Sequence, residues 1–262
     1  PGNMLDSEIG FLQDIGIRIH FETRVGEDIS FEEIYEKHDA VFIGIGFGRP
    51  YTLSIPGEET KGSIQAIDFL EWINKGMKID IGKKAAIIGG GNVAMDAARV
   101  ARRLGTEVTV LYRRRVVDMP ADEEEIEGAY DEGVVIEPQT IPVEVISDQG
   151  KVKAVKYLRA KMVREDKGGR PRPAPIEGSE EIIEIDTIIG AIGQEAEYGF
   201  IPQDYLEKLE MKKGRILVDK YNKTTLDRVF AGGDSVNTTA DAISAIADGH
   251  RAALGIEKLL LK

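Results

Sequence analysis

The sequence predicts an α/β protein built around a parallel sheet, and three observations lead to this fold class. Residues 84–111 read as an apolar strand, a glycine turn, a helix and a second apolar strand. Two other apolar strands, 40–43 and 182–189, both run into Ile-Gly, which suggests two crossings between domains. The 262 residues, 42% hydrophobic and 31% charged, are compatible with one large or two modest globular domains.

The elements expected before the glycine turn follow from apolar periodicity and from turn residues. Residues 4–15 have the pattern of an amphipathic helix, and residues 17–21 have that of a short strand. The strand 40–43 ends in a cluster of glycines that predicts a turn or hinge. A helix is expected over 63–75, with Ser63 as its N-cap.

The elements expected from residue 84 onward begin with the strand–helix–strand unit. Its strands are 84–88 and 107–111, and the helix between them is 92–104. The remaining expected elements are, in order, an acidic helix 122–132, a β-rich stretch 134–163, a rigid polar loop 166–175, a buried strand 182–189, a strand 215–218 and a helix 240–261.

The glycine turn fits the dinucleotide fingerprint G-x-G-x-x-(G/A). Gly89 allows the tight turn, Gly91 lets a phosphate approach bare backbone, and Ala94 lets the helix pack close to the sheet. A pyrophosphate is then expected on the free N–H groups at the start of the helix. The alternative is a purely structural turn. The residues assigned to nucleotide binding here are Gly89, Gly90, Gly91, Asn92, Val93 and Ala94.

The second strand of the unit ends in Tyr112 followed by three arginines, where an NAD-binding unit would carry a carboxylate for the ribose 2′-hydroxyl. Guanidinium groups at this place favour a 2′-phosphate, which they hold by charge-assisted hydrogen bonds. Arg113 and Arg114 therefore predict binding of NADP(H) rather than NAD(H). The alternative is that the arginines only solvate the end of a strand.

The composition excludes several classes of function. The net charge of −12 argues against non-specific nucleic-acid binding, and no apolar run of about 18 residues predicts a membrane span. The absence of cysteine excludes disulfides, thiolate metal ligands and a redox dithiol within this chain. The three scattered histidines do not suggest a metal site. We expect a cytoplasmic location.

Several motifs together resemble one family along nearly the whole chain. The segments GGGNVAMDAAR, LYRRR and MPADEEEIEGAYDEGV are similar to the nicotinamide-binding part of the glutamate synthase small (beta) subunit and its relatives. Those relatives include dihydropyrimidine dehydrogenase and NADPH–ferredoxin oxidoreductase subunits. Further matches are VGEDISFEE, DAVFIGIG, IPGEE, AIDFLEWIN, GRPRPAPIEGSE, AIGQ and VFAGGDSV.

The resemblance implies a disulfide-reductase-like flavoprotein in which a Rossmann-like NADPH-binding domain is inserted into an FAD-binding domain. The expected boundaries are 1–46 and 194–262 for a partial FAD-binding domain and 47–193 for the NADPH-binding domain. Gly193 lies at the second crossing and is also assigned to cofactor binding. NADPH would pass a hydride to the flavin, and the flavin would pass electrons to iron–sulfur clusters. Alternatives are a non-catalytic NADPH-binding or assembly fragment, or a subunit of another NADPH-fed reductase.

The family's FAD residues carry over onto the second part of the chain. Gly233 and Asp234 match a GGD motif whose carboxylate accepts a hydrogen bond from the ribityl chain, and the backbone of Ala242 and Ile243 would face the flavin pyrimidine. The alternative for Asp234 is a turn or capping carboxylate. Hydride transfer needs alignment of two rings and no acid or base, so no catalytic residue is expected. The carboxylates 122–125 are expected to compensate a helix dipole.

The sequence departs from the family at two places. No strand–GxGxxG–helix unit for the FAD pyrophosphate precedes residue 85, and the family's cysteine-rich segment is also missing. We therefore expect a fragment whose partner is a missing N-terminal FAD and iron–sulfur segment or a large partner subunit. Asp241 stands where relatives have a neutral residue, and this carboxylate would be unfavourable beside a reduced flavin unless it caps the last helix.

Overall fold

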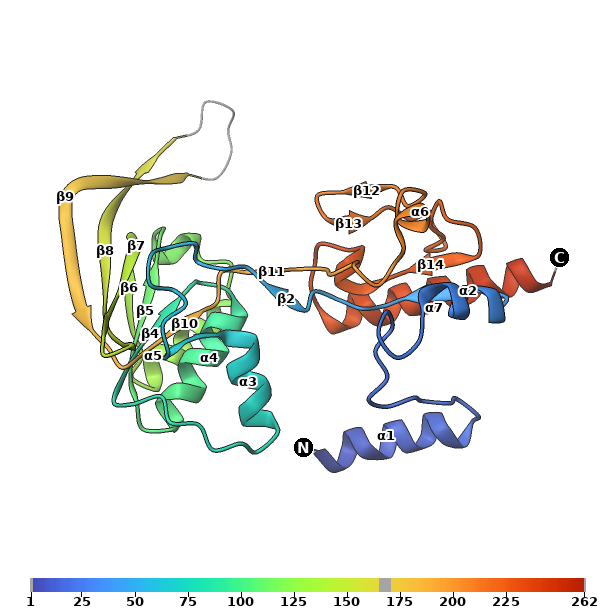
Figure 1. Ribbon diagram of the computed structural model, residues 1–262, viewed down its shortest axis with the longest axis horizontal. Coiled ribbons are helices and arrows are strands. Elements are labelled where there is room, and N and C mark those ends of the chain that lie inside the picture. The colour runs from blue at the N-terminus through green and yellow to red at the C-terminus, as the bar shows by residue number, and fades with distance from the viewer. Residues whose placement is uncertain (1, 165–170, 262) are drawn as a thin grey trace. The chain divides into compact units, whose positions relative to one another are not determined.

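The computed structural model describes residues 2–164 and 171–261, and the chain divides into two compact units (Figure 1). Unit 1 comprises Pro1–Gly46 and Ala196–Lys262, and unit 2 comprises Phe47–Glu195. The chain thus leaves unit 1 after Gly46 and returns to it after Glu195. The boundaries expected from the sequence follow residues 46 and 193.

Unit 2 is built on a five-stranded sheet with the order β3-β10-β4-β5-β6. Every pair in it is parallel, so the carboxyl ends of all five strands lie at one edge. β10, which comes last in the sequence, lies between β3 and β4. The strands are β3 (Ser63–Gln65), β4 (Lys84–Ile88), β5 (Glu107–Tyr112), β6 (Val135–Pro138) and β10 (Thr187–Gly190).

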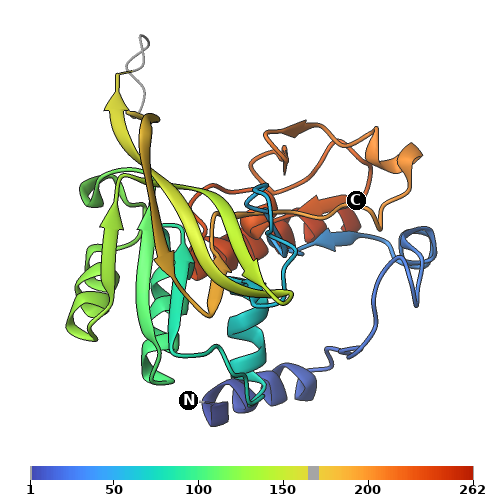
Figure 2. The same cartoon turned by 60° about the vertical axis from the view of Figure 1, so that its left-hand side comes forward.

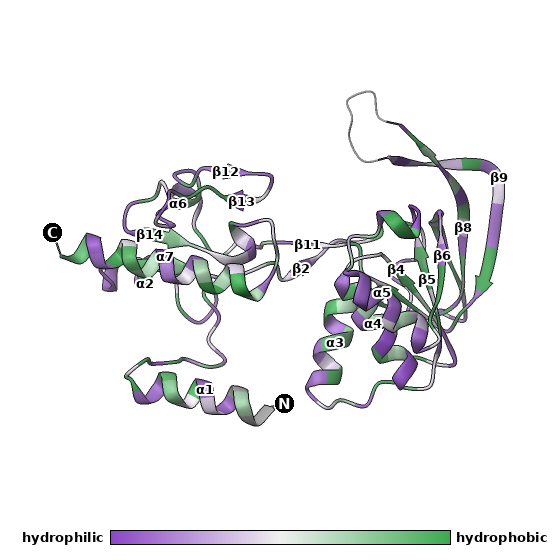
Figure 3. Ribbon diagram, turned by 180° about the vertical axis from the view of Figure 1, so that it is seen from behind, coloured by the Kyte–Doolittle hydropathy of each residue, from purple (hydrophilic) through white to green (hydrophobic). Residues whose placement is uncertain are grey.

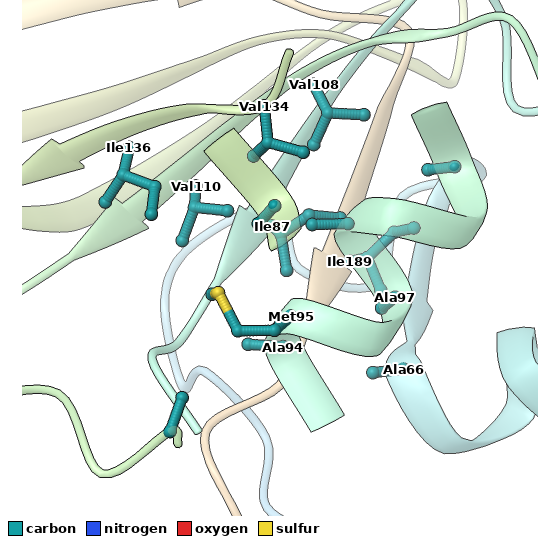
Figure 4. Close-up of a cluster of buried hydrophobic side chains, with 14 of the residues drawn as sticks. Ala66, Ile87, Ala94, Met95, Ala97, Val108, Val110, Val134, Ile136 and Ile189 are labelled. Carbon is teal, nitrogen blue, oxygen red and sulfur yellow. The ribbon is translucent and has the colours of Figure 1, made fainter. Parts of the chain in front are cut away.

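Helices cover one face of this sheet. The alanine-rich face of α4 is fully buried against Ile87 and Ile189 of the sheet, and Met95 fills the space beside it (Figure 4). Small side chains let the helix axis approach the strands closely, which brings the start of α4 to the carboxyl edge of the sheet. The elements on this face are α3 (Ala66–Asn74), α4 (Asn92–Arg103), α5 (Glu123–Asp131) and the short 3₁₀ helix η1 (Val116–Asp118).

An antiparallel sheet covers the other face. Alternate strand residues such as Ile88 and Ile188 turn away from the helices and pack on Val145 and Val155. Two strands of this sheet, β8 and β9, form the long yellow and ochre hairpin in Figure 2. The sheet consists of β7 (Thr140–Asp148), β8 (Lys151–Val163) and β9 (Arg172–Glu184), and a separate short ladder pairs β2 (Arg49–Pro50) with β11 (Gln194–Glu195).

Unit 1 has a small core under a two-stranded parallel sheet, in which β1 pairs with β14. Phe31 and Ile43 pack with Val229 in this core. The side chain of Ser30 accepts a hydrogen bond from the backbone N–H of Glu33 and so caps α2. The elements are α1 (Gly2–Asp14), α2 (Phe31–Lys37), β1 (Val41–Ile43), α6 (Gln203–Leu206), β12 (Met211–Lys212), β13 (Arg215–Ile216), β14 (Val229–Ala231), η2 (Gly233–Ser235) and α7 (Ala242–Leu260).

Apolar side chains remain exposed on unit 1. Phe42 of β1 is 41% exposed, and Ile243 and Ile246 of α7 are 81% and 61% exposed. Figure 3 shows apolar residues, in green, along α7. Parallel sheets are normally covered on both faces and contain more than two strands, so this sheet exposes surface that such a layer usually buries. No helix in the described part of the chain is both long enough and apolar enough to cross a membrane.

Two expected elements of the first half are wrong. Residues 17–21 form no strand, because no neighbouring strand pairs with them in the described structure. Ser63 does not cap a helix but lies in β3, where it pairs with Ile188. The helix α3 begins at Ala66 instead, with Gln65 as its N-cap. Pairing with a strand more than a hundred residues away overrides the local capping pattern at Ser63.

Two expected elements around β9 are also wrong. Residues 172–175 were expected in a loop, but they lie in β9 and pair with β8. Pro173 and Pro175 are tolerated there because β9 is an edge strand, whose free side needs no N–H donor. The expected strand 182–189 is two strands, since β9 ends at Glu184 and β10 begins at Thr187 in another sheet. Residues 166–170 of the expected loop lie outside the described residues.

Candidate nucleotide-binding site

The first two glycines after β4 are required by the packing of the chain itself. Gly89 has a φ of 147°, and a Cβ added to it would lie 2.2 Å from the carbonyl oxygen of Ala191. A Cβ at Gly90 would lie 2.6 Å from the ring of Tyr112. Both distances are far shorter than a carbon atom allows, so these positions admit only glycine.

The third glycine is different, because nothing in the described chain requires it. Gly91 has φ −95° and ψ 178°, an extended conformation that any residue adopts. A Cβ there would meet only Pro120, at 3.9 Å, which is ordinary van der Waals contact. One side of the turn at Gly91 is therefore open, and the packing of the described chain does not use it.

Backbone N–H groups at the start of α4 are available to an anion. The carbonyl of Gly91 accepts hydrogen bonds from Ala94 and Met95, which closes the first turn, but no side chain caps the helix. Within the described residues, the N–H groups of Asn92 and Val93 have no acceptor. These groups carry the positive end of the helix dipole beside the open face of Gly91.

The side chain of Asn92 is engaged by the protein. Its amide nitrogen donates to the Asp122 carboxylate at 2.9 Å, and its amide oxygen accepts the Asp122 N–H at 2.8 Å. The N–H of Ala121 donates to the carbonyl of Gly90 at 3.1 Å. These bonds hold the loop after β5 against the turn, so only the backbone of Asn92 is left for a ligand. Asp122 serves this contact and makes no side-chain cap to α5.

The three arginines after β5 have different surroundings. Arg115 pairs with Asp118 at 2.8 Å, and this hydrogen bond raises the pKa of Arg115. Arg114 is partly buried, and its Nε donates to the carbonyl of Pro171 at 3.1 Å. Arg113 is exposed and has no ion-pair or hydrogen-bond partner in the described part of the chain. The guanidinium of Arg113 and the terminal nitrogens of Arg114 are thus the groups left for a phosphate.

The sheet register brings the arginines and the turn to the same edge. Ile88 pairs with Leu111 in the parallel ladder, so the turn after Ile88 and the arginines after Tyr112 leave neighbouring strands side by side. The hydroxyl of Tyr112 donates to the carbonyl of Asp118 at 2.8 Å, which fixes the loop that carries the arginines.

Gly193 lies on the segment that follows β10 at this edge. It has a φ of 112°, in the region that favours glycine, and its carbonyl accepts a hydrogen bond from the N–H of Tyr51 at 3.0 Å. The backbone conformation therefore accounts for this glycine without a ligand. Its neighbour Ala191 is the residue that packs on Gly89.

In unit 1, the motif Gly232-Gly233-Asp234 follows β14. Gly233 has a φ of 69° and begins the 3₁₀ turn η2. The Asp234 side chain is partly buried and accepts no hydrogen bond from the described residues. Asp234 is therefore not used as a turn or capping carboxylate there, and its oxygens are available to a ligand.

A residue that the sequence analysis did not single out, Asp248, holds this turn in place. It lies on α7 and is buried, with 2% of its surface exposed. Its carboxylate accepts hydrogen bonds from the N–H of Gly233 at 2.9 Å, from the side chains of Asn237 at 2.8 Å and Asn222 at 3.0 Å, and from Arg251 at 2.5 Å. A carboxylate inside an otherwise apolar stretch of a helix, AISAIAD, is a signal that could have identified it.

The start of α7 carries the other residues expected near a flavin. Ala242 and Ile243 begin the helix and are exposed. Asp241 is its N-cap, and its carboxylate accepts hydrogen bonds from the Ser244 N–H at 2.7 Å and hydroxyl at 2.9 Å. These bonds lower the pKa of Asp241. Asp241, the carboxylate at a position where relatives have a neutral residue, thus caps the last helix, which is one of the two roles considered for it from the sequence.

Comparison with known sequences shows the family of this chain. It belongs to the pyridine nucleotide-disulphide oxidoreductase family, which it matches over residues 11–249. It is similar to the NADPH-Fe(3+) oxidoreductase subunit beta of Geobacter sulfurreducens, with 37% identity over 287 aligned residues that cover 99% of this chain and 42% of the relative. It is also similar to the glutamate synthase (NADPH) small chain of Escherichia coli, with 32% identity over 264 residues, 92% of this chain and 55% of the relative.

These matches confirm the resemblance to the glutamate synthase small subunit and its relatives. The chain spans about half the length of the curated relatives that it matches. In structure, it is similar to FprA of Mycobacterium tuberculosis in complex with NADPH, with a TM-score of 0.74 and 20% identity over 91% of this chain and 67% of that chain. The fold class, a disulfide-reductase-like flavoprotein fold with two dinucleotide-binding parts, is confirmed.

The open face of Gly91 leads to the first prediction. Gly91→Ala should leave the free energy of unfolding unchanged or raise it by about 0.5 kcal/mol, because Ala fits this backbone and reduces the entropy of the unfolded chain. The same change should lower NADPH affinity at least tenfold, since the methyl group occupies the space beside the free N–H groups. Urea unfolding and calorimetry measure the two effects. The control Gly90→Ala should destabilise the protein, and undiminished NADPH affinity in Gly91→Ala would make the turn purely structural.

The second prediction concerns Asp248. Burial raises its pKa, but the hydrogen bonds from Asn237, Asn222 and Arg251 outweigh this, and the net pKa is lowered. A lowered folded-state pKa gives stability that is present above the unfolded value and is lost as the pH falls through the acid range. Asp248→Asn should therefore cost about 2 kcal/mol of unfolding free energy at pH 7.

The loss of unfolding free energy caused by Asp248→Asn should be smaller at about pH 3.5 than at about pH 7. Protonation begins to remove the stabilising effect of the wild-type carboxylate at the lower pH. Urea unfolding at the two pH values measures this. Asp227→Asn is the control, because the Asp227 side chain is exposed and, among the described residues, pairs only with Lys223. A loss of the same size at both pH values would contradict the assigned role of the charge.

Proposed function

We propose that this chain is the NADPH-binding part of a flavoprotein oxidoreductase that takes a hydride from NADPH to FAD and passes the electrons to iron–sulfur clusters. The observation that carries this proposal is the glycine at position 91. The fold leaves this glycine open, next to backbone N–H groups that have no acceptor among the described residues. Arg113, which has no partner in the same part of the chain, follows the neighbouring strand at the same sheet edge. The names of the relatives, NADPH-Fe(3+) oxidoreductase subunit and glutamate synthase small chain, support it.

The residues present fit NADPH. The pyrophosphate would lie on the N–H groups of Asn92 and Val93, against the open face of Gly91. Ala94 is fully buried, and its small side chain lets α4 come close enough to the strands for this contact. Arg113 and Arg114 would hold the 2′-phosphate, whose charge these guanidinium groups complement.

The residues of unit 1 fit part of an FAD site. Asp234 offers a carboxylate without a partner among the described residues, and Gly233 provides the turn that Asp248 holds. Ala242 and Ile243 present the start of α7. When bound, FAD would supply the acceptance of a hydride and its release as two electrons and a proton. The contribution of the chain is to bind and orient the two cofactors, and no side chain has to give or take a proton.

The rest of the enzyme would be a segment or subunit that carries the remaining FAD contacts and the iron–sulfur clusters. The exposed Phe42 and the two-stranded sheet β1–β14 support this, because such a sheet buries its apolar surface only when further chain covers it. The occupant would be an N-terminal FAD and iron–sulfur segment or a large partner subunit. The proposed location of the enzyme is the cytoplasm.

A second candidate function is an NADPH-binding module in which FAD is held elsewhere. The same small sheet of unit 1 favours it, since the turn at Gly233 and Asp234 supplies only part of the contacts that a dinucleotide needs. Purified protein decides between the two. A flavin absorbance band supports the first function, whereas a colourless protein that binds NADPH supports the module.

The arginines lead to the third prediction. Arg113→Ala combined with Arg114→Ala should weaken NADPH binding about tenfold or more and leave NADH binding nearly unchanged, because only NADPH carries the phosphate that pairs with them. Calorimetric titration with both nucleotides measures the ratio. Arg115→Ala is the matched control, since Asp118 already neutralises this arginine. Equal losses for NADPH and NADH would overturn the 2′-phosphate assignment.

A further inference from the structure

A glutamine in unit 2 has a buried oxygen without a hydrogen-bond donor. Gln65 is the last residue of β3 and the N-cap of α3, but its side chain does not cap the helix. Its Oε1 is buried and has no donor, and in the described ranges 2–164 and 171–261 it is the one buried side-chain atom in this condition. A buried polar atom without a partner lowers the stability of the folded state. A role in binding a ligand would explain why a glutamine is kept at this position.

The position of Gln65 connects it to the turn at Gly89–Gly91. Gly190 of β10 pairs with Gln65 on one side and with Ile88 on the other. Adjacent strands lie about 4.8 Å apart, so Gln65 is about 10 Å across the sheet edge from the residue that precedes the turn. A Cβ at Gly190 would lie 3.0 Å from the Gln65 Oε1, so the glycine leaves room for the amide at this edge.

The order of the strands gives the direction in which a bound dinucleotide continues. In the proposed function, the 2′-phosphate lies after β5 and the pyrophosphate lies after β4. The sheet continues in the same direction through β10 to β3. The nicotinamide half then lies over the ends of β10 and β3, where Gln65 stands.

We propose that Gln65 recognises the carboxamide of the nicotinamide ring of NADPH, with Oε1 accepting a hydrogen bond from the carboxamide N–H. This inference rests on the proposed function. The Gln65 amide nitrogen has no partner among the described residues either, and it is not sealed from solvent. No hydrogen bond from the described residues therefore fixes the amide in one orientation, and rotation about its terminal bond brings Oε1 to the ligand.

The test compares wild type with Gln65→Met in the whole chain, because methionine has a similar length and no amide. Adenosine 2′,5′-bisphosphate, which lacks the nicotinamide, is the reference ligand. Gln65→Met should lower NADPH affinity roughly three- to tenfold and leave the affinity for the bisphosphate unchanged. Its stability toward urea should be equal or higher, because the unpaired oxygen is removed. Gln203→Met, a change of an exposed glutamine on α6, should alter neither affinity.

A second measurement on the wild type needs no variant. The 3-acetylpyridine analogue of NADPH lacks the carboxamide N–H, so wild type should bind it roughly three- to tenfold more weakly than NADPH. Equal binding of the analogue, or unchanged NADPH affinity in Gln65→Met, would overturn the assignment. So would equal losses for both ligands or a marked loss of stability, since either shows a structural role. Wild type that binds neither NADPH nor the bisphosphate would overturn the proposed function itself.

Discussion

Unit 2 depends on one close backbone contact, between Gly89 at the end of β4 and Ala191 just after β10. A side chain at Gly89 would overlap the Ala191 carbonyl, so the two segments approach to the limit that bare backbone allows. The approach accompanies the parallel pairing of β10 with β3 on one side and β4 on the other, although β10 comes about a hundred residues after both. A one-residue slip in β10 would move its apolar residues to the opposite faces.

Around that contact, the protein uses its own polar groups to hold the loops and leaves other groups unpaired. Asn92 and Asp122 bind each other, and Tyr112 binds the carbonyl of Asp118. Arg115 is paired by Asp118, whereas Arg113 has no partner in the described chain. A site of this kind is rigid before a ligand arrives, so little ordering entropy is lost on binding. The same division appears in unit 1, where Asp248 holds the turn and Asp234 is left available.

The local pattern predicted well wherever neighbouring residues decide the structure. The strand–helix–strand unit 84–111, the acidic helix near 122–132 and the last helix were predicted within a few residues of α4, α5, α7 and their neighbours. The candidate residues around Gly89–Gly91 and Arg113–Arg114 came from the same pattern, and the fold places them at one edge of a sheet. Their cofactor roles stay predictions.

The sequence by itself determined the fold class and the family, because these depend on residue type at fixed spacing, and the NADP preference inferred from the arginines stays a prediction. The tertiary structure decided what depends on partners far along the chain. It placed Ser63 in a strand beside Ile188, brought Asp248 to Gly233, and showed that Gly91 alone of the three turn glycines has open space. It also left the Gln65 oxygen without a donor among the residues that the structure describes. No local pattern carries such information, since pairing and packing partners come from residues separated by many positions.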